Sequence, residues 1–358
     1  MLPPDAFAMS PEEALYHLGQ AYAAEMRGDN RAAYLRFRHL HFYDTEDAQR
    51  SETYEKMMQR LKNLEPLSLS AGGSVLPTSN VYRSSRQDSF ETEIGDFPLD
   101  ESKGGLGLAL SLGTQLTHAY VPGREFEFGL IGGYSYYDDP ALRTTTLTGS
   151  ATHRWFEAGR RYSLTASVTD YSYEDIATRT SPDASQSGLA GSASFRLDDD
   201  RIMTISSSYL ETEYTERDYL NGWVFGTNIG YSWPMQNSVR FEVSAGLSLS
   251  DVQNDAYSYQ GVTAGVAGTK RVSSGLLDGL TYGLGISGEW LDYKSDFDAL
   301  PYARQDTVTD ITLDLSHSRL TVGDMQPRLS CTARYHISNV ALYDYQSVDC
   351  ALKLDYRF

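Results

Sequence analysis

The chain has 358 residues and carries 48 Asp and Glu against 30 Lys and Arg, which gives a formal net charge of -18. A surplus of this sign argues against nucleic acid as a partner, because surfaces that bind nucleic acid are basic. Mean hydropathy is -0.42, and no stretch approaches the ~18 consecutive apolar residues that a spanning helix requires, so any membrane-spanning structure must be built from strands.

The first ten residues, MLPPDAFAMS, contain neither the basic segment nor the apolar segment of a signal peptide. Two explanations are open at this point. Either the protein is cytoplasmic, or its signal peptide is absent from this chain. The strand pattern described below favours the second explanation.

Residues 1–64 are expected to form a helical region. Ser10 and Glu13 match a capping box for a first helix, and Asp29 and Thr45 can cap two further helices. Apolar residues follow each cap at helical spacing. The expected result is three short amphipathic helices rather than a membrane anchor.

The small and aromatic residues of this region are spaced much as in a tetratricopeptide unit, with two extra residues before the turn. The matching residues are Leu18, Gly19, Tyr22, Gly28, Asp29, Ala33 and Phe37. Two interpretations stay open with equal weight. One is a peptide-binding repeat, and the other is a helical hairpin that packs beside the larger domain.

Residues 65–358 are expected to form a second domain, in which apolar residues recur at every second position. Fourteen strands are predicted, at 66–73, 104–117, 124–137, 144–156, 160–173, 184–197, 201–214, 219–233, 238–250, 256–270, 279–293, 304–317, 328–337 and 347–358. An even number is what a barrel with both ends on one side requires. The expected fold is therefore mainly β, a 14-stranded antiparallel transmembrane β-barrel preceded by a small α-helical region.

The connections between predicted strands alternate in length. HAYVPG, DDD and PMQN are short, whereas a connection of about thirty residues follows the first strand and EDIATRTSPDA and KSDFDALP fall at the same end. Outer-membrane barrels have short periplasmic turns and longer external loops, so this pattern predicts that the helices lie in the periplasm. TERD and DDPALR are short exceptions at the external end.

One face of the predicted strands is apolar and the other carries charges of both signs. The charged positions are Arg240, Glu242, Glu289, Asp310, Asp314, Arg328, Arg334, Lys353, Asp355 and Arg357. Burying so many ions in a dry core would be prohibitive, whereas a wide, wet lumen can hold them. The apolar face is therefore expected to contact outer-membrane lipid, and these residues are candidates for lining the lumen and contacting a passing protein.

The chain ends in DCALKLDYRF, where Tyr356 and Phe358 share one face of the last predicted strand. The last strand of an outer-membrane barrel typically ends in an aromatic residue that the barrel assembly machinery recognises. Tyr356 and Phe358 resemble such an assembly signal.

Two further motifs lie near the two ends of the predicted barrel. LPTSNVYR, just after the first predicted strand, supplies Pro77, Ser79 and Asn80, and SNVALYDY, which opens the last hairpin, supplies Asn339, Tyr343 and Tyr345. Together with helices that run into a fourteen-stranded barrel, these motifs resemble the surface lipoprotein assembly modifiers, or Slam proteins, over roughly residues 10–358.

This resemblance implies a translocation factor that helps selected lipoproteins or soluble effector proteins cross the outer membrane of a Gram-negative bacterium to the cell surface. It also implies a client lipoprotein or secreted protein as partner, with the helices contacting clients or a periplasmic chaperone. The chain holds barely one and a half repeats, fewer than the family pattern. The alternative function is a passive outer-membrane porin for small solutes.

The sequence offers little for catalysis, so no enzyme activity, cofactor or metal site is expected. The histidines of the barrel region are not spaced with Cys or carboxylates as a metal site needs. Ser330 and His336 share the polar face, but no third group marks a hydrolase, and a polar lumen lining is preferred. Cys331 and Cys350 could form a cross-strand disulfide, although two small lipid-facing residues are the simpler interpretation.

Overall fold

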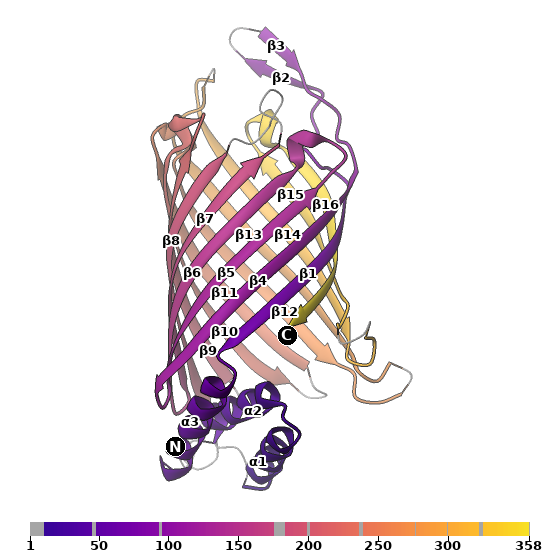
Figure 1. Ribbon diagram of the computed structural model, residues 1–358. Helices are drawn as coiled ribbons and strands as arrows, with labels where there is room; N and C mark the ends of the chain where they lie inside the picture. Colours follow the sequence, from indigo (N-terminus) through magenta and orange to yellow (C-terminus); the bar gives the residue numbers. More distant parts are fainter. Residues whose placement is uncertain are drawn as a thin grey trace, which may run out of the picture.

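The computed structural model describes residues 11–44, 48–92, 95–174, 183–198, 201–235, 239–275, 277–298, 300–321 and 325–357. Three helices lie at one end of a tall barrel of tilted strands, and both ends of the described chain lie toward this end (Figure 1). A small two-stranded hairpin projects beyond the opposite end (Figure 1).

The three helices confirm the helical periodicity of the N-terminal region. They are α1 (Pro11–Met26), α2 (Asn30–Tyr43) and α3 (Ala48–Leu64). Asp29 caps α2 as expected, because its Oδ1 accepts a hydrogen bond of 2.9 Å from the backbone amide of Ala32. Ser10 and Thr45, the other expected caps, lie outside the described residues. No helix in the described part of the chain is long and apolar enough to span a membrane.

The helices enclose a small apolar core of their own. Phe37 and Leu40 of α2 are completely buried, and they pack against Ala21 of α1 and against Tyr54 and Leu61 of α3. Burial of these side chains supplies the main driving force for the helical packing.

Fourteen antiparallel strands close into a barrel in which β1 lies between β4 and β16, which confirms the predicted strand number. They are β1 (Leu67–Thr78), β4 (Gly105–Val121), β5 (Arg124–Tyr136), β6 (Thr144–Glu157), β7 (Arg160–Tyr173), β8 (Ala184–Asp198), β9 (Arg201–Tyr214), β10 (Gly222–Met235), β11 (Val239–Val252), β12 (Tyr259–Arg271), β13 (Leu280–Asp296), β14 (Ala303–His317), β15 (Arg328–Ser338) and β16 (Tyr345–Arg357).

Short elements at the end remote from the helices were not predicted. β2 (Ser89–Thr92) and β3 (Gly95–Pro98) form the projecting hairpin, and 3-10 turns join several strand pairs. The turns are η2 (Pro140–Leu142), η3 (Asp218–Leu220), η4 (Asp255–Tyr257) and η5 (Ala341–Tyr343). Four-residue strands are too short to show a clear alternation, which is why the sequence did not reveal them.

The two faces of the wall differ as the alternation requires. Leu112 on the apolar face is 70% exposed in the isolated chain. Two neighbouring glycines of β5 show which face is concave, because side chains crowd together on the concave side of a curved sheet. On the polar face, a Cβ added to Gly133 would lie 2.6 Å from Thr146 Oγ1. On the apolar face, a Cβ added to Gly132 would meet nothing within 4 Å. The polar face is therefore the crowded inner wall, and the apolar face looks outward.

Aromatic rings form part of a belt on the outer face near the helices. Tyr120, Phe126, His153, Trp155 and Tyr162 follow one another across β4 to β7, with successive ring centroids 4.6 to 5.4 Å apart. Such belts lie at the level of the lipid headgroups in membrane barrels.

Loop length separates the two ends less cleanly than expected. Turns 122–123 and 158–159 at the helical end are short, as predicted. However, connections 272–279 and 318–327 at this same end are longer than 137–143 at the opposite end. The position of the helices therefore follows from β1, which begins directly after α3 at this end of the barrel, and not from loop length.

Candidate functional site

The barrel closes where its first strand meets its last. The register between β1 and β16 runs from Ser70, opposite Arg357, to Val75, opposite Leu352, and resumes at Thr78. Leu76 is not paired with β16 in this ladder, and neither is Pro77, which has no amide hydrogen to donate. We call this junction the closing seam.

The position of Pro77 corrects one expectation. The first strand extends to Thr78 rather than ending near residue 73, so Pro77 lies inside β1 and not after it. There it is paired with Leu106 of β4. The strand continues because β4 offers an unbroken partner along its whole length, a tertiary effect that the local pattern does not report.

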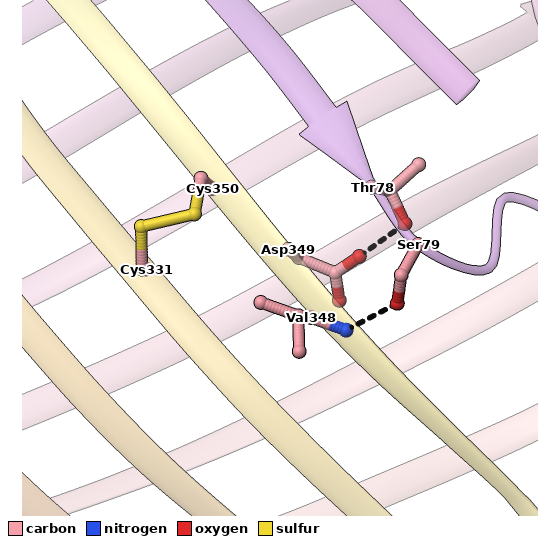
Figure 2. The surroundings of a disulfide bond; sticks show 6 residues. All are labelled: Thr78, Ser79, Cys331, Val348, Asp349 and Cys350. Carbon is pink, nitrogen blue, oxygen red and sulfur yellow. Dashed lines mark hydrogen bonds between the residues drawn. A yellow bond between two sulfur atoms is a disulfide. The ribbon is translucent and has the colours of Figure 1, made fainter. Parts of the chain in front are cut away.

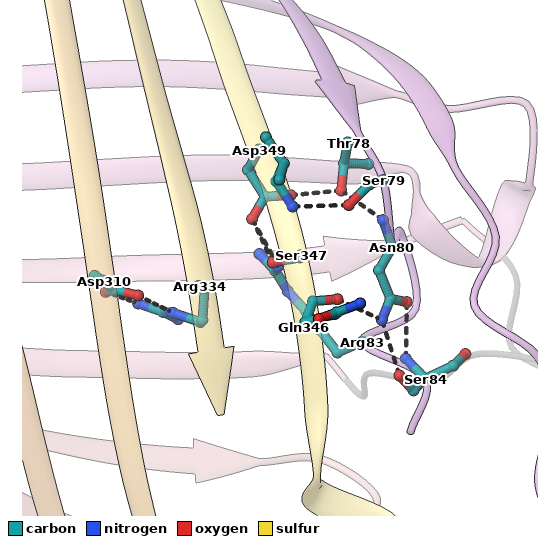
Figure 3. A network of polar contacts seen from close by, with 11 residues as sticks. Thr78, Ser79, Asn80, Arg83, Ser84, Asp310, Arg334, Gln346, Ser347 and Asp349 are labelled. Atoms are coloured by element: carbon teal, nitrogen blue, oxygen red, sulfur yellow. Dashed lines mark hydrogen bonds and ion pairs between the residues drawn. The ribbon is translucent and has the colours of Figure 1, made fainter. Parts of the chain in front are cut away.

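Ser79 and Asn80 connect the end of β1 to β16 (Figure 3). The Ser79 amide donates to the Val348 carbonyl at 3.0 Å, and the Val348 amide donates to Ser79 Oγ at 2.7 Å. Asn80 is 2% exposed, and its Nδ2 donates to the carbonyls of Ser84 at 2.8 Å and Gln346 at 3.1 Å. The Asn80 amide therefore ties the loop both to itself and to the last strand.

Residues 79–88, which we call the strap, continue across the outer end of the seam. Arg83 Nη1 lies 2.6 Å from Asp349 Oδ2 on β16 and also donates to Ser347 Oγ. Arg83 has a φ of 57°, which residues with a Cβ rarely adopt, so its contacts must hold it there. The strap thus carries a strained residue at its point of ionic contact.

The second half of the strap contacts the turn before β16. Ser85 Oγ donates to the Ala341 carbonyl of η5 at 2.6 Å. The Arg86 amide donates to the Asp344 carbonyl at 2.7 Å, and Arg86 Nε donates to Asp344 Oδ1 at 3.0 Å. Asp344 is buried under these contacts.

The residues of the terminal motif lie around the same corner. Asn339 Oδ1 accepts a hydrogen bond of 2.7 Å from the backbone amide of Gln305, which ties the β15–β16 turn to β14. The Tyr343 ring lies under the Arg304 guanidinium, 3.4 Å from its Cζ. The Tyr345 ring lies beside the His336 ring, with centroids 4.9 Å apart and ring planes tilted by 54°. The two motifs, far apart in the sequence, therefore meet at one end of the closing seam.

The cysteines require a correction. Cys331 and Cys350 are directly opposite on β15 and β16, and they form a disulfide on the outer face of the wall (Figure 2). The preferred interpretation of two free lipid-facing residues was wrong. The alternation of residues in the sequence placed both cysteines on the same face of the wall. Only the register between β15 and β16 shows that they lie directly opposite one another.

A cavity of about 360 Å³ lies against the interrupted part of the seam. Leu76, Pro77 and Thr78 line it from β1, and Asp349 and Lys353 line it from β16. The missing pairs therefore coincide with open space at the wall.

Those predicted lumen residues whose side chains are described face the inner wall, and several of them are paired. Arg334 holds Asp310 on the neighbouring strand through two hydrogen bonds of 2.8 and 2.6 Å (Figure 3). Arg240 donates to Ser232 at 3.2 Å, and Glu289 accepts from Ser248 at 3.5 Å. The register places Glu242, Asp314, Arg328 and Lys353 on the same face.

The side chains of Asp355 and Arg357 lie outside the described part, and so does Phe358. Tyr356 lies opposite Ala71 of β1, on the outward face.

Two ionic groups of the inner wall were absent from the predicted set. Arg154 pairs with Glu127, with Nη2 3.0 Å from Oε1, at the helical end. Arg304 donates to Asp306 at 2.9 Å near the opposite end. The same strand alternation could have found Glu127 and Arg154.

The middle of the inner wall from β6 to β8 carries paired hydroxyls. Thr148 and Thr169 are 3.0 Å apart, as are Thr152 and Thr165, and Ser163 and Ser192 are 2.8 Å apart. These small hydroxyl side chains give the wall a polar surface and leave room for water, which suits a water-filled lumen.

The helices are tied to the barrel by a buried polar contact. Tyr34 of α2 donates to Glu125 of β5 at 3.1 Å, and both residues are buried. Burial and then the Glu125 charge raise the pKa of Tyr34, so its hydroxyl stays protonated as a donor. Asn63 of α3 adds a hydrogen bond of 3.0 Å to the Ala119 carbonyl of β4.

Ser330 and His336 lie too far apart to act as a Ser–His pair. His336 Nε2 lies 2.9 Å from Asp306 Oδ2, which supplies an orienting carboxylate that the sequence did not reveal. Ser330 is six residues away on the same strand, and this spacing corresponds to about 20 Å. Among the described residues, no group of His, Cys, Asp and Glu could hold a metal ion.

No curated protein sequence matches the chain significantly. Among solved structures, the outer membrane protein OprD of Pseudomonas aeruginosa is 11% identical, with a TM-score of 0.40 and coverage of 82% of this chain and 92% of that chain. The outer membrane channel DcaP of Acinetobacter baumannii is 10% identical, with a TM-score of 0.44 and coverage of 82% and 96%. The anion-selective porin of Comamonas acidovorans is 10% identical, with a TM-score of 0.43 and coverage of 82% and 98%.

A family model described as surface lipoprotein assembly modifier matches residues 68–358, which is nearly all of the barrel. The closed barrel and its outward apolar face agree with this match. The protein is thus an outer-membrane β-barrel, and the chain belongs to the surface lipoprotein assembly modifier family.

Proposed function

We propose that this protein is a translocation factor that delivers lipoproteins or soluble effector proteins across the outer membrane to the cell surface. The single observation that carries the proposal is the family match along residues 68–358. The two motifs that resemble this family meet at the closing seam, where Asn80 and Asp344 are buried.

In this proposal, residues 1–64 form a periplasmic helical region and residues 65–358 form the membrane domain. The helices receive the client, or a chaperone that carries it, on tetratricopeptide-like surfaces. Their attachment through Tyr34 and Glu125 keeps this surface next to the barrel mouth. The barrel assembly machinery inserts the chain by recognising its C-terminal strand, with Tyr356 and Phe358 as the signal.

The charged inner wall is proposed to contact the client during passage. Arg334 and Asp310 already satisfy one another, so they stiffen the wall and present little free charge. Lys353 lines the cavity at the seam together with hydroxyl groups. The proposal contains no catalytic step.

Deletion of the gene in its host tests the proposal. A lipid-anchored or secreted protein encoded beside it serves as the candidate client, and externally added protease measures its surface exposure. We expect surface exposure to be lost on deletion and restored by the wild-type gene, with the total amount of client unchanged. Unchanged exposure in the deletion strain would contradict the proposal.

A passive porin is the second candidate function, and the hydroxyl-lined wall from β6 to β8 favours it. Steady conductance of the purified protein in planar bilayers, without any client, would support a porin. Translocation predicts instead that conductance is small or intermittent until a client is present.

A further inference from the structure

We propose that the closing seam opens sideways into the bilayer and lets the acyl chains of a lipid-anchored client leave the barrel toward the outer leaflet. This inference rests on the proposed function and adds a route for the lipid part of the client. A wet, charged lumen is a poor environment for acyl chains, because exposure of hydrocarbon to water is unfavourable. A lateral path avoids most of that exposure.

β1 has the properties of an edge strand although it lies inside a closed barrel. Pro77 cannot donate a ladder hydrogen bond, and proline inside a sheet is normally confined to edges and bulges. Gly72 and Gly73 lie in the middle of the same strand, where glycine weakens strand formation. The ladder between β1 and β16 lacks pairs at Leu76 and Pro77.

The neighbouring junctions are better held. β1 is paired with β4 without interruption from Leu67, opposite Leu116, to Thr78, opposite Gly105. On the other side, the disulfide between Cys331 and Cys350 joins β16 covalently to β15 (Figure 2). Separation between β1 and β16 therefore leaves each strand attached to its other neighbour, and no equivalent covalent link crosses the seam among the described residues.

The cavity at the seam lies beside the interrupted pairs. Leu76, Pro77 and Leu142 give it a small apolar part, whereas Lys353, Arg83 and several hydroxyl groups make the rest of its lining polar. The cavity lies where the backbone ladder is already interrupted, so a lipid chain entering there displaces no hydrogen bond between Pro77 and β16.

The strap closes the outer end of this junction (Figure 3). Its ion pair between Arg83 and Asp349 is partly exposed to solvent. Exposed ion pairs contribute little stability individually and weaken in salt, so such a contact lets the strap detach from β16 when the seam opens. The strap then limits how often the seam opens without preventing it.

A pair of engineered disulfides tests the proposal. Gly73 lies opposite Leu354 across the seam and opposite Leu110 across the β1–β4 junction. The variant G73C/L354C locks the seam, and G73C/L110C is the matched control that locks the other side of the same residue. A Cβ at Gly73 meets only Leu110 Cδ2, at 3.8 Å, so the substitution fits in the folded barrel.

Both variants are folded in the reduced state, checked by heat-modifiable migration, and then oxidised. Two clients are compared, the acylated client and the same client with its acylated cysteine replaced by serine. We expect the seam cross-link to reduce surface display of the acylated client to the level of the deletion strain, with recovery after reduction. The control cross-link should leave display at the wild-type level, and the client without acyl chains should pass both.

Full display of the acylated client through the oxidised seam variant would overturn the lateral route. Equal inhibition by the control cross-link would also overturn it, because general stiffening would then explain the loss. Loss of both clients with the seam cross-link would show that the seam is not a lipid path. Absence of display with the wild-type protein would instead refute the proposed function itself, and the inference with it.

Discussion

At the scale of single residues, the closing seam depends on groups whose partners lie at the other end of the sequence. Proline, serine and asparagine at 77, 79 and 80 are ordinary turn formers, and that is all that local chemistry could predict. Their contacts with Gln346 and Val348 could not be predicted, because a sequence pattern does not report which loop lies over which strand. The structural role of Asn80 follows only from its burial.

Asn80→Ala should destabilise the barrel. The substitution removes the side-chain amide that donates to two carbonyls, and it leaves the half-buried backbone N–H and carbonyl of Ser84 without this partner. We expect a loss of about 2 kcal/mol in the free energy of unfolding, measured by urea unfolding in lipid vesicles. Ser84→Ala is the control, because only the backbone of Ser84 contacts Asn80. Equal stability of the two variants would show that the Asn80 amide does not hold the strap.

His39 of α2 should make the helices sensitive to acid. Burial, followed by the charges of His17 and nearby arginines, lowers the pKa of His39 from 6.5 to about 4. Between these values the unfolded chain binds a proton that the folded chain does not, so stability rises with pH. We expect the helices to lose stability as the pH falls from about 6.5 to about 4, measured by amide hydrogen exchange.

His39→Gln removes this titration, so the pH dependence of exchange should become weaker in the variant. His41, whose pKa burial also lowers, contributes in the same direction and should leave a residual slope. An identical pH dependence in wild type and His39→Gln would contradict the assignment.

At the scale of secondary structure, the alternation of apolar and polar residues predicted the fourteen wall strands, because one face of each strand meets lipid and the other meets water. Strand ends were less predictable. β1 extends to Thr78 because β4 pairs with it throughout, and β2 and β3 are too short for any period to show. Pairing of Cys331 with Cys350 depended on register, which a one-residue shift would have changed.

Removal of the disulfide should weaken the terminal hairpin. Cys331 and Cys350 are 19 residues apart, and a cross-link of that span stabilises a protein by about 3 kcal/mol. We expect Cys331→Ser/Cys350→Ser to lower the free energy of unfolding by roughly this amount, and a reducing agent to do the same to the wild type. The reducing agent should have no effect on the double variant, and a reductant effect there would contradict the explanation.

The attachment of the helices can be tested through one hydroxyl. Tyr34→Phe keeps the ring in place and removes the donor to Glu125, which leaves that buried carboxylate less well solvated. We expect the free energy that holds the helices on the barrel to fall by about 2 kcal/mol, seen as faster cleavage of α2 and α3 by protease. Tyr16→Phe is the control, because Tyr16 is an exposed residue of α1, and this variant should be cleaved at the wild-type rate.

At the scale of the whole molecule, the account depends on a wall that is apolar outside and polar inside. The sequence predicted this arrangement because a dry interior could not hold residues such as Arg240 and Glu242. It did not predict that the closing strands would carry the interrupted ladder, the disulfide and the strap together, because these features depend on strand register and on loop contacts. The candidate site is a product of barrel closure.

The most direct test of the proposed function uses the purified protein alone. Proteoliposomes with this barrel inserted in one orientation receive an acylated client, held by a chaperone, on the side of the helices. Protease inside the vesicles reports arrival at the other side. The account predicts that the client is cleaved inside vesicles that contain the wild-type barrel and remains intact in vesicles with an unrelated barrel of similar size. Equal protection of the client in both kinds of vesicle would contradict it.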